Sequence, residues 1–147
     1  MKLVDVDETV VVVTGSSASA TMKDVPVAQW LAAEIDRRGL GQAYRRAVVI
    51  GDRGYVHTPA FHGNPTIGIG GPGSNDVVQH LSQTLPTVWN RDDRSFVQMS
   101  LDGRNRQVAL WGMDSEATRH AVEAFVEEGM LDALLTRLWP FRPTTLV

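Results

Sequence analysis

The sequence contains no cysteine. This absence excludes a disulfide framework, a thiolate nucleophile and a zinc site built from cysteine ligands. Long hydrophobic runs are also missing, since no stretch approaches the roughly 20 apolar residues that a membrane-spanning helix requires. We therefore expect no membrane partner.

A strong charge of one sign is absent as well. The chain has 14 basic and 17 acidic side chains, for a net charge of −3. Arg37, Arg38, Arg45 and Arg46 cluster locally, but we interpret them as solvated charges at a helix end, where cations are favourable. Only Tyr44 could offer a stacking surface among them, so we expect no nucleic-acid partner.

The length of 147 residues, with 43% hydrophobic and 21% charged side chains, predicts a single globular domain covering residues 1–147. In the N-terminal stretch, Ala18, Ser19 and Ala20 resemble the cleavage site of a secretion signal. Acidic Asp5 and Asp7 occupy the place of the positive region of such signals. The sequence therefore favours a mature, cytoplasmic protein.

Short apolar runs predict buried parallel strands over 9–13, 47–50 and 66–70. A helix is predicted to begin near Asp24 and Pro26 and to end at Gly39, with Val27, Trp30, Leu31 and Ile35 inward. A second helix is predicted over 76–84.

The remaining pattern predicts a hairpin of 95–101 and 107–111 around Asp102-Gly103. A long helix should then begin at Asp114 or Ser115 and be interrupted near Gly129. This alternation predicts an α/β fold: a three-layer, doubly wound, Rossmann-like or flavodoxin-like domain with a mostly parallel sheet and an antiparallel edge hairpin.

In such folds ligands bind beyond the carboxyl ends of the strands. Segments 14–24, 51–64, 70–76 and 112–115 are expected to gather there. Their small and hydroxyl-bearing residues suggest a site for a small anionic ligand or another chain. The predicted ligand-binding residues are Thr14, Gly15, Ser16, Ser17, Gly70, Gly71, Gly73, Ser74 and Asn75.

The run from Gly68 to Gly73 matches the G-x-G-x-x-G dinucleotide motif. However, Gly68 and Gly70 are expected within the strand, and Pro72 removes a backbone N–H that a phosphate cradle would use. Asp92 and Asp93, at the distance of a ribose contact, follow no predicted strand. We therefore expect structural glycines rather than a dinucleotide cofactor.

Asp24, Asp76 and Asp114 are each predicted at a helix N-terminus, where a carboxylate disfavours an incoming anion. With Asp52 they could instead hold a magnesium ion, and the metal candidates are Asp52, Asp76 and Asp114. This placement of acids resembles the acidic pocket of receiver domains and other magnesium-dependent phosphoryl-transfer domains. Those domains also require a lysine late in the sheet, which this chain lacks, so their activity is not carried over.

Nucleophilic catalysis would need a hydroxyl, a base and an orienting acid. The catalytic candidates are Ser16, Ser17, His57 and Asp52, although no G-x-S-x-G elbow is present.

Two hypotheses follow. The first is a non-catalytic binding or assembly module, with a homodimer or another protein as partner. The alternative is a small hydrolase or magnesium-dependent phosphoryl-transfer enzyme using Asp52 with Ser16, Ser17 or His57. We favour the first because the sequence does not show a complete set of catalytic residues. The apolar tail from Trp139 is expected to fold back on the domain in preference to docking on a partner.

Overall fold

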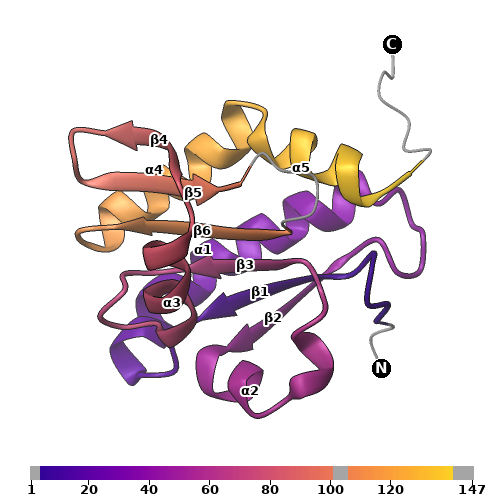
Figure 1. Ribbon diagram of the computed structural model, residues 1–147, viewed down its shortest axis with the longest axis horizontal. Coiled ribbons are helices and arrows are strands. Elements are labelled where there is room, and N and C mark those ends of the chain that lie inside the picture. The colour runs from indigo at the N-terminus through magenta and orange to yellow at the C-terminus, as the bar shows by residue number, and fades with distance from the viewer. Residues whose placement is uncertain (1–3, 101–105, 141–147) are drawn as a thin grey trace.

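In the computed structural model, which describes residues 4–100 and 106–140, one six-stranded sheet forms the centre of the chain (Figure 1). Its order is β2-β1-β3-β6-β5-β4. The first four of these strands are parallel, and β4 and β5 add an antiparallel edge. The strands are β1 (Val10–Thr14), β2 (Ala47–Gly51), β3 (Thr66–Ile69), β4 (Thr87–Arg91), β5 (Ser95–Met99) and β6 (Gln107–Gly112). The predicted α/β class and mostly parallel sheet are confirmed.

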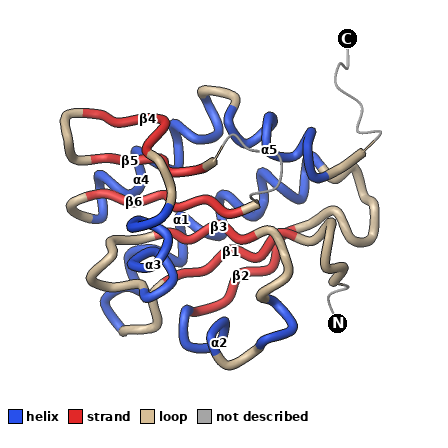
Figure 2. The backbone as a smooth tube through the Cα atoms, in the orientation of Figure 1, coloured by secondary structure: helices blue, strands red, loops and turns tan. Residues whose placement is uncertain are grey.

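Helices cover both faces of the sheet (Figure 2). They are α1 (Ala18–Arg38), α2 (Asp52–Val56), α3 (Asp76–Thr84), α4 (Ser115–Glu127) and α5 (Met130–Leu138), with a short 3₁₀ turn at Pro59–Phe61. Strand β1 explains why the valine run is continuous: Val10 and Val12 pack into the core beneath α1 and α4, while Val11 and Val13 face Tyr55 of α2. A strand buried on both faces needs apolar side chains on both.

The predicted start of the first helix was wrong. Helix α1 begins at Ala18, with Ser17 as its N-cap. Residues 18–24, which were expected in a loop, are therefore helical, and Pro26 lies inside the helix. Pro26 is exposed, so the hydrogen bond that it cannot make lies on the solvent side. Trp30, predicted inward, is 43% exposed.

Three elements were not predicted. Strand β4 precedes β5 and is joined to it by Asp92 and Asp93, which therefore do follow a strand. The loop after β2 contains α2 and the 3₁₀ turn. Strands β5 and β6 pair antiparallel as predicted, while Asp102-Gly103 lies outside the described residues.

Two residues of the arginine cluster, Arg38 and Arg45, are less solvated than predicted, whereas the Arg37 side chain is 66% exposed. Arg38 forms ion pairs with Glu34 and Asp132, and Arg45 forms one with Glu8. Both arginine side chains are therefore largely buried, and each forms an ion pair with a residue distant in the sequence.

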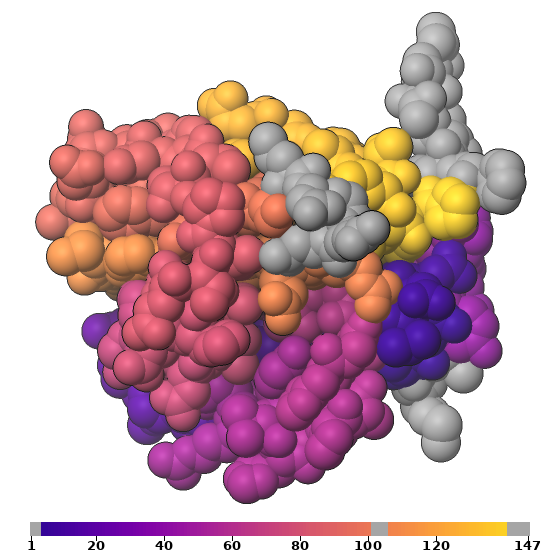
Figure 3. Space-filling model, in the orientation of Figure 1, coloured from indigo at the N-terminus to yellow at the C-terminus, as the bar shows by residue number. Residues whose placement is uncertain are grey.

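The end of the described chain folds back on its beginning. The Trp139 side chain is fully buried, and its indole N–H donates to the Glu8 carbonyl at 2.8 Å. Figure 3 shows the first described residues beside the end of α5. Residues 141–147 of the predicted tail lie outside the described residues. Among the helices described, none combines the length and the apolar composition needed to cross a bilayer.

Candidate functional site

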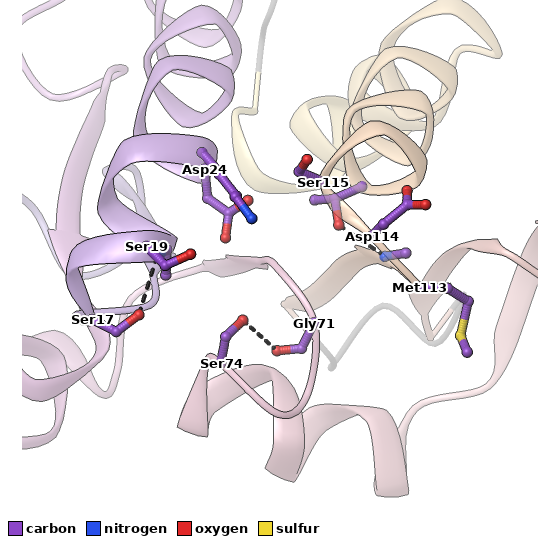
Figure 4. Close-up of a pocket in the computed structure, with 12 residues that line it drawn as sticks. Ser17, Ser19, Asp24, Gly71, Ser74, Met113, Asp114 and Ser115 are labelled. Carbon is purple, nitrogen blue, oxygen red and sulfur yellow. Dashed lines mark hydrogen bonds between the residues drawn. The ribbon is translucent and has the colours of Figure 1, made fainter.

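A pocket of about 220 Å³ opens at the carboxyl ends of β1, β3 and β6 (Figure 4). Three segments surround it: the start of α1, the loop between β3 and α3, and the loop between β6 and α4. The lining residues are Ser17, Ser19, Ala20, Lys23, Asp24, Gly71, Ser74, Gly112, Met113, Asp114, Ser115 and Thr118.

Asn75 holds two of these segments in place. Its fully buried side-chain amide donates to the Val13 carbonyl at 3.0 Å and to the Ile69 carbonyl at 2.9 Å. Its oxygen accepts from the N–H groups of Val77 and Val78, which caps α3. The ends of β1 and β3 are thereby tied to the start of α3.

Gly15 permits the loops after β1 and β3 to touch. A Cβ at this position would lie 2.1 Å from the Ser74 carbonyl oxygen, so any larger residue would force the loops apart. The site is therefore preformed by close backbone contact.

Asp24 is the unusual group of the pocket. It is only 6% exposed, and its carboxylate makes no hydrogen bond or ion pair with any other residue in the described part of the chain. It points from α1 toward Gly71 and Ser74 (Figure 4). Burial raises the pKa of Asp24, and nearby Lys23 opposes that rise only in part.

Gly70 leaves the space that this carboxylate occupies. Its φ of +119° is a conformation that side chains rarely adopt, and a Cβ there would lie 2.7 Å from Asp24 Oδ2. Within the G-x-G-x-x-G run, Gly70 thus leaves space for the Asp24 side chain.

Several polar groups of the lining are already used in capping. Ser17 Oγ accepts from the Ala20 N–H at 3.1 Å, and Asp114 Oδ1 accepts from the Ala117 N–H at 2.8 Å. The second oxygen of Asp114 pairs with Arg94. That backbone hydrogen bond, together with Arg94, lowers the pKa of Asp114.

Other lining groups make no hydrogen bond or ion pair within residues 4–100 and 106–140, although one of them, Lys23, lies close enough to Asp24 to lower the pKa of that carboxyl. They are the hydroxyls of Ser19 and Ser115 and the ammonium of Lys23. The first turn of α1 carries no acidic residue, so the predicted carboxylate block at this helix N-terminus is absent. Asp24 lies deeper in the helix, beside the pocket.

Asp52 has a different environment. Its Oδ1 accepts from the Ser16 hydroxyl at 2.5 Å and from the Arg53 N–H at 2.9 Å, and its Oδ2 accepts from the Asp76 N–H at 2.8 Å. Burial would raise the pKa of Asp52, but these hydrogen bonds outweigh it and the pKa is lowered. Asp52 therefore anchors three backbone segments and is a weak base.

The catalytic candidates are only partly brought together. Ser16 contacts Asp52, whereas Ser17 caps α1 and lines the pocket. His57 is exposed at the far end of α2, about 7.5 Å along the helix axis from Asp52. No triad is assembled from these residues.

The metal candidates do not form one cluster, although Asp52 and Asp76 are neighbours. Asp52 binds backbone groups, Asp76 lies in the first turn of α3, and Asp114 caps α4. Within the described ranges, no three histidine, aspartate or glutamate side chains gather as a metal site.

Of the predicted ligand-binding residues, Ser17, Gly71 and Ser74 line the pocket. The others do not, and they are Thr14, Gly15, Ser16, Gly70, Gly73 and Asn75. Sequence reasoning missed Ser19, Lys23, Ser115 and Thr118, and it assigned Asp24 to capping. All lining residues except Thr118 nevertheless fall within segments 14–24, 70–76 and 112–115.

No protein-family model matches this chain, and no curated protein matches its sequence. The functional assignment therefore depends on the chemistry of the pocket.

Proposed function

We propose that the protein is a non-catalytic binding module that holds a small polar ligand in the pocket between α1, the β3–α3 loop and the β6–α4 loop. The observation that carries this proposal is the carboxylate of Asp24, a residue only 6% exposed, which makes no hydrogen bond in the described residues and is open to the pocket. The ligand would present a hydrogen-bond donor or a cationic group to it.

Among the described residues, the Asp24 carboxylate lacks the hydrogen-bond partners that buried polar groups usually have. Buried polar groups in native proteins almost always have partners, and leaving one unsatisfied costs about 1–3 kcal/mol. A carboxylate that faces a pocket recovers this free energy when a ligand supplies the donor. A perturbed acid in a concave site is accordingly a candidate for ligand recognition.

The position of the pocket supports the same proposal. We assign the fold to the doubly wound class, because the β2-β1-β3 order is the one with which flavodoxin-like sheets begin. In that class the ligand lies where the strand order reverses, between the loops after β1 and β3. Beyond β3 the order differs, with β6, β5 and β4 following.

The alternative is a small hydrolase or magnesium-dependent phosphoryl-transfer enzyme using Asp52. The contact between Ser16 and Asp52 favours it. However, activating a serine hydroxyl requires a good base, and the lowered pKa of Asp52 makes its carboxylate a poor one. Binding is therefore the better-supported function.

The test is a thermal-shift screen of the purified protein against amines, amino acids, phosphorylated metabolites, sugars and nucleosides, each with and without magnesium. A ligand that binds only the folded state raises the melting temperature. We expect one class to do so, Ser19→Tyr to abolish the rise by filling the pocket, and Gln29→Tyr to preserve it. Gln29 is exposed on the same helix and does not line the pocket.

Two results would overturn the proposal. One is the absence of any shift across the panel in folded protein. The other is a shift of equal size in the Ser19→Tyr and Gln29→Tyr variants, which would place the binding site elsewhere.

A further inference from the structure

We infer that the ligand is a short zwitterion, whose ammonium group binds Asp24 and whose anionic group binds the first turn of α1. This inference rests on the proposed function, because it names the ligand class of the same pocket. It follows from the separation of two complementary sets of groups along one helix.

The cationic end is specified by Asp24 and Ser74. Asp24 Oδ2 and Ser74 Oγ both lie near Gly70, at 2.7 Å and 3.8 Å from the position that a Gly70 Cβ would take, and both residues line the pocket. An ammonium group donates three hydrogen bonds, which suits a carboxylate with a neighbouring hydroxyl. A magnesium ion prefers several oxygen ligands in a strict octahedron, and the described residues provide no acidic cluster there.

The anionic end is specified by the start of α1. This helix has 21 residues and no acidic residue in its first turn. The N–H groups of Ala18 and Ser19 have no acceptor in the described segments, and Ser19 lines the pocket, so the positive end of the helix dipole lies beside the site. Lys23 lies one turn after Ser19, and both line the pocket.

The spacing limits the length of the ligand. Ser19 and Asp24 are five positions apart, which corresponds to about 7.5 Å along the helix axis. Each charged group of the ligand lies about 3 Å from its protein partner, so the two charges of a ligand that bridges these groups should lie closer together than about 7.5 Å. An aminoalkyl phosphate such as phosphoethanolamine has this spacing, and the pocket of about 220 Å³ suits a molecule of that size.

The experiment is isothermal titration calorimetry of the full chain with phosphoethanolamine. Two further probes, ethanolamine and inorganic phosphate, each carry one of its charges. We expect phosphoethanolamine to bind about tenfold or more tightly than either half, because only it satisfies both ends. Asp24→Asn should weaken phosphoethanolamine binding by about tenfold or more, with little change for phosphate. Glu127→Gln, an equal change of net charge at an exposed site outside the pocket, should leave all affinities unchanged.

The contradicting outcomes separate the two proposals. If a sugar, a nucleoside or one of the single-charge probes binds as tightly, the zwitterion inference fails while the binding function stands. If magnesium ions alone bind and Asp24→Asn removes that binding, the ammonium assignment is wrong. If no probe of any class binds to folded protein, both proposals fail.

Discussion

Asp24 and Asp52 lie at the same edge of the sheet, yet their pKa values shift in opposite directions. Burial without a partner raises the pKa of Asp24, whereas three donors outweigh burial and lower the pKa of Asp52. Both carboxylate oxygens of Asp52 already accept hydrogen bonds from the protein itself. The Asp24 carboxylate makes no hydrogen bond in the described residues, and under the proposed function a ligand supplies its donor.

We predict that Asp24→Asn stabilises the ligand-free protein at neutral pH. Because the pKa of Asp24 is raised in the folded state, protonation of Asp24 stabilises the protein at pH values below its ordinary pKa of 3.8. This stabilisation is lost as the pH rises through the folded-state pKa. Removing the charge should add about 1 kcal/mol to the free energy of unfolding, or roughly 2–4 °C in melting temperature. Thermal unfolding across pH measures this difference, which should shrink as the solution is acidified. A variant less stable than the native protein at neutral pH would contradict the assignment.

The opposite behaviour is expected of Asp52→Asn. Because the pKa of Asp52 is lowered in the folded state, its ionised carboxylate stabilises the protein at pH values above its ordinary pKa of 3.8. This stabilisation is lost as the pH falls through the folded-state pKa. Losing the ionised acceptor should decrease the free energy of unfolding at neutral pH by about 2–3 kcal/mol, measured by urea denaturation. An unchanged stability would remove the anchoring role and favour the enzymatic alternative.

At the scale of elements, the turn between β4 and β5 depends on two residues in the left-handed region. Asp92 has a φ of +56° and Asp93 a φ of +52°, which match the right-handed twist of a tight hairpin. Aspartate tolerates this conformation better than most residues, and β-branched residues tolerate it poorly.

Asp92→Val should therefore lower the free energy of unfolding by about 1–2 kcal/mol, while Asp92→Gly should not lower it. Chemical denaturation of the two variants and the native protein measures the difference. Equal stability of the valine and glycine variants would show that the turn does not constrain this residue.

The elements differ in how far the sequence could predict them. Helices α3 and α4 could be predicted because an apolar period follows a capping residue, Asn75 or Asp114. Strand β4 gave no such signal, since on this edge strand only Trp89 is even partly buried. Helix α1 begins in a serine-rich segment typical of a loop, and the Ser17 cap decides its start.

At the scale of the whole molecule, the buried indole of Trp139 joins the end of α5 to the N-terminal segment. Trp139→Ala removes its packing and its hydrogen bond to Glu8, and it should cost about 3–5 kcal/mol of unfolding free energy. The matched substitution Trp30→Ala, at a side chain 43% exposed, should cost about 1 kcal/mol or less. Denaturation of both variants checks the contrast, and equal losses would contradict the fold-back.

The location of the site could be predicted from topology, but its key residue could not. Carboxyl ends of parallel strands meet at one edge, so the loop segments follow from the strand pattern alone. The burial of Asp24 depends on where α1 begins and on how closely Gly70 approaches it, which are tertiary facts. The predicted helix start near Asp24 assigns this residue to capping, whereas the structure places it inside α1 and beside the pocket.

We expect the pocket beside Asp24 to bind a small ligand. The most direct measurement is a ¹H–¹⁵N NMR titration of the labelled protein with phosphoethanolamine. We predict saturable shift changes centred on the amides of Ser19, Gly71 and Ser115, and their loss in Asp24→Asn. Changes confined to other residues, or no changes at saturating ligand, would contradict the claim.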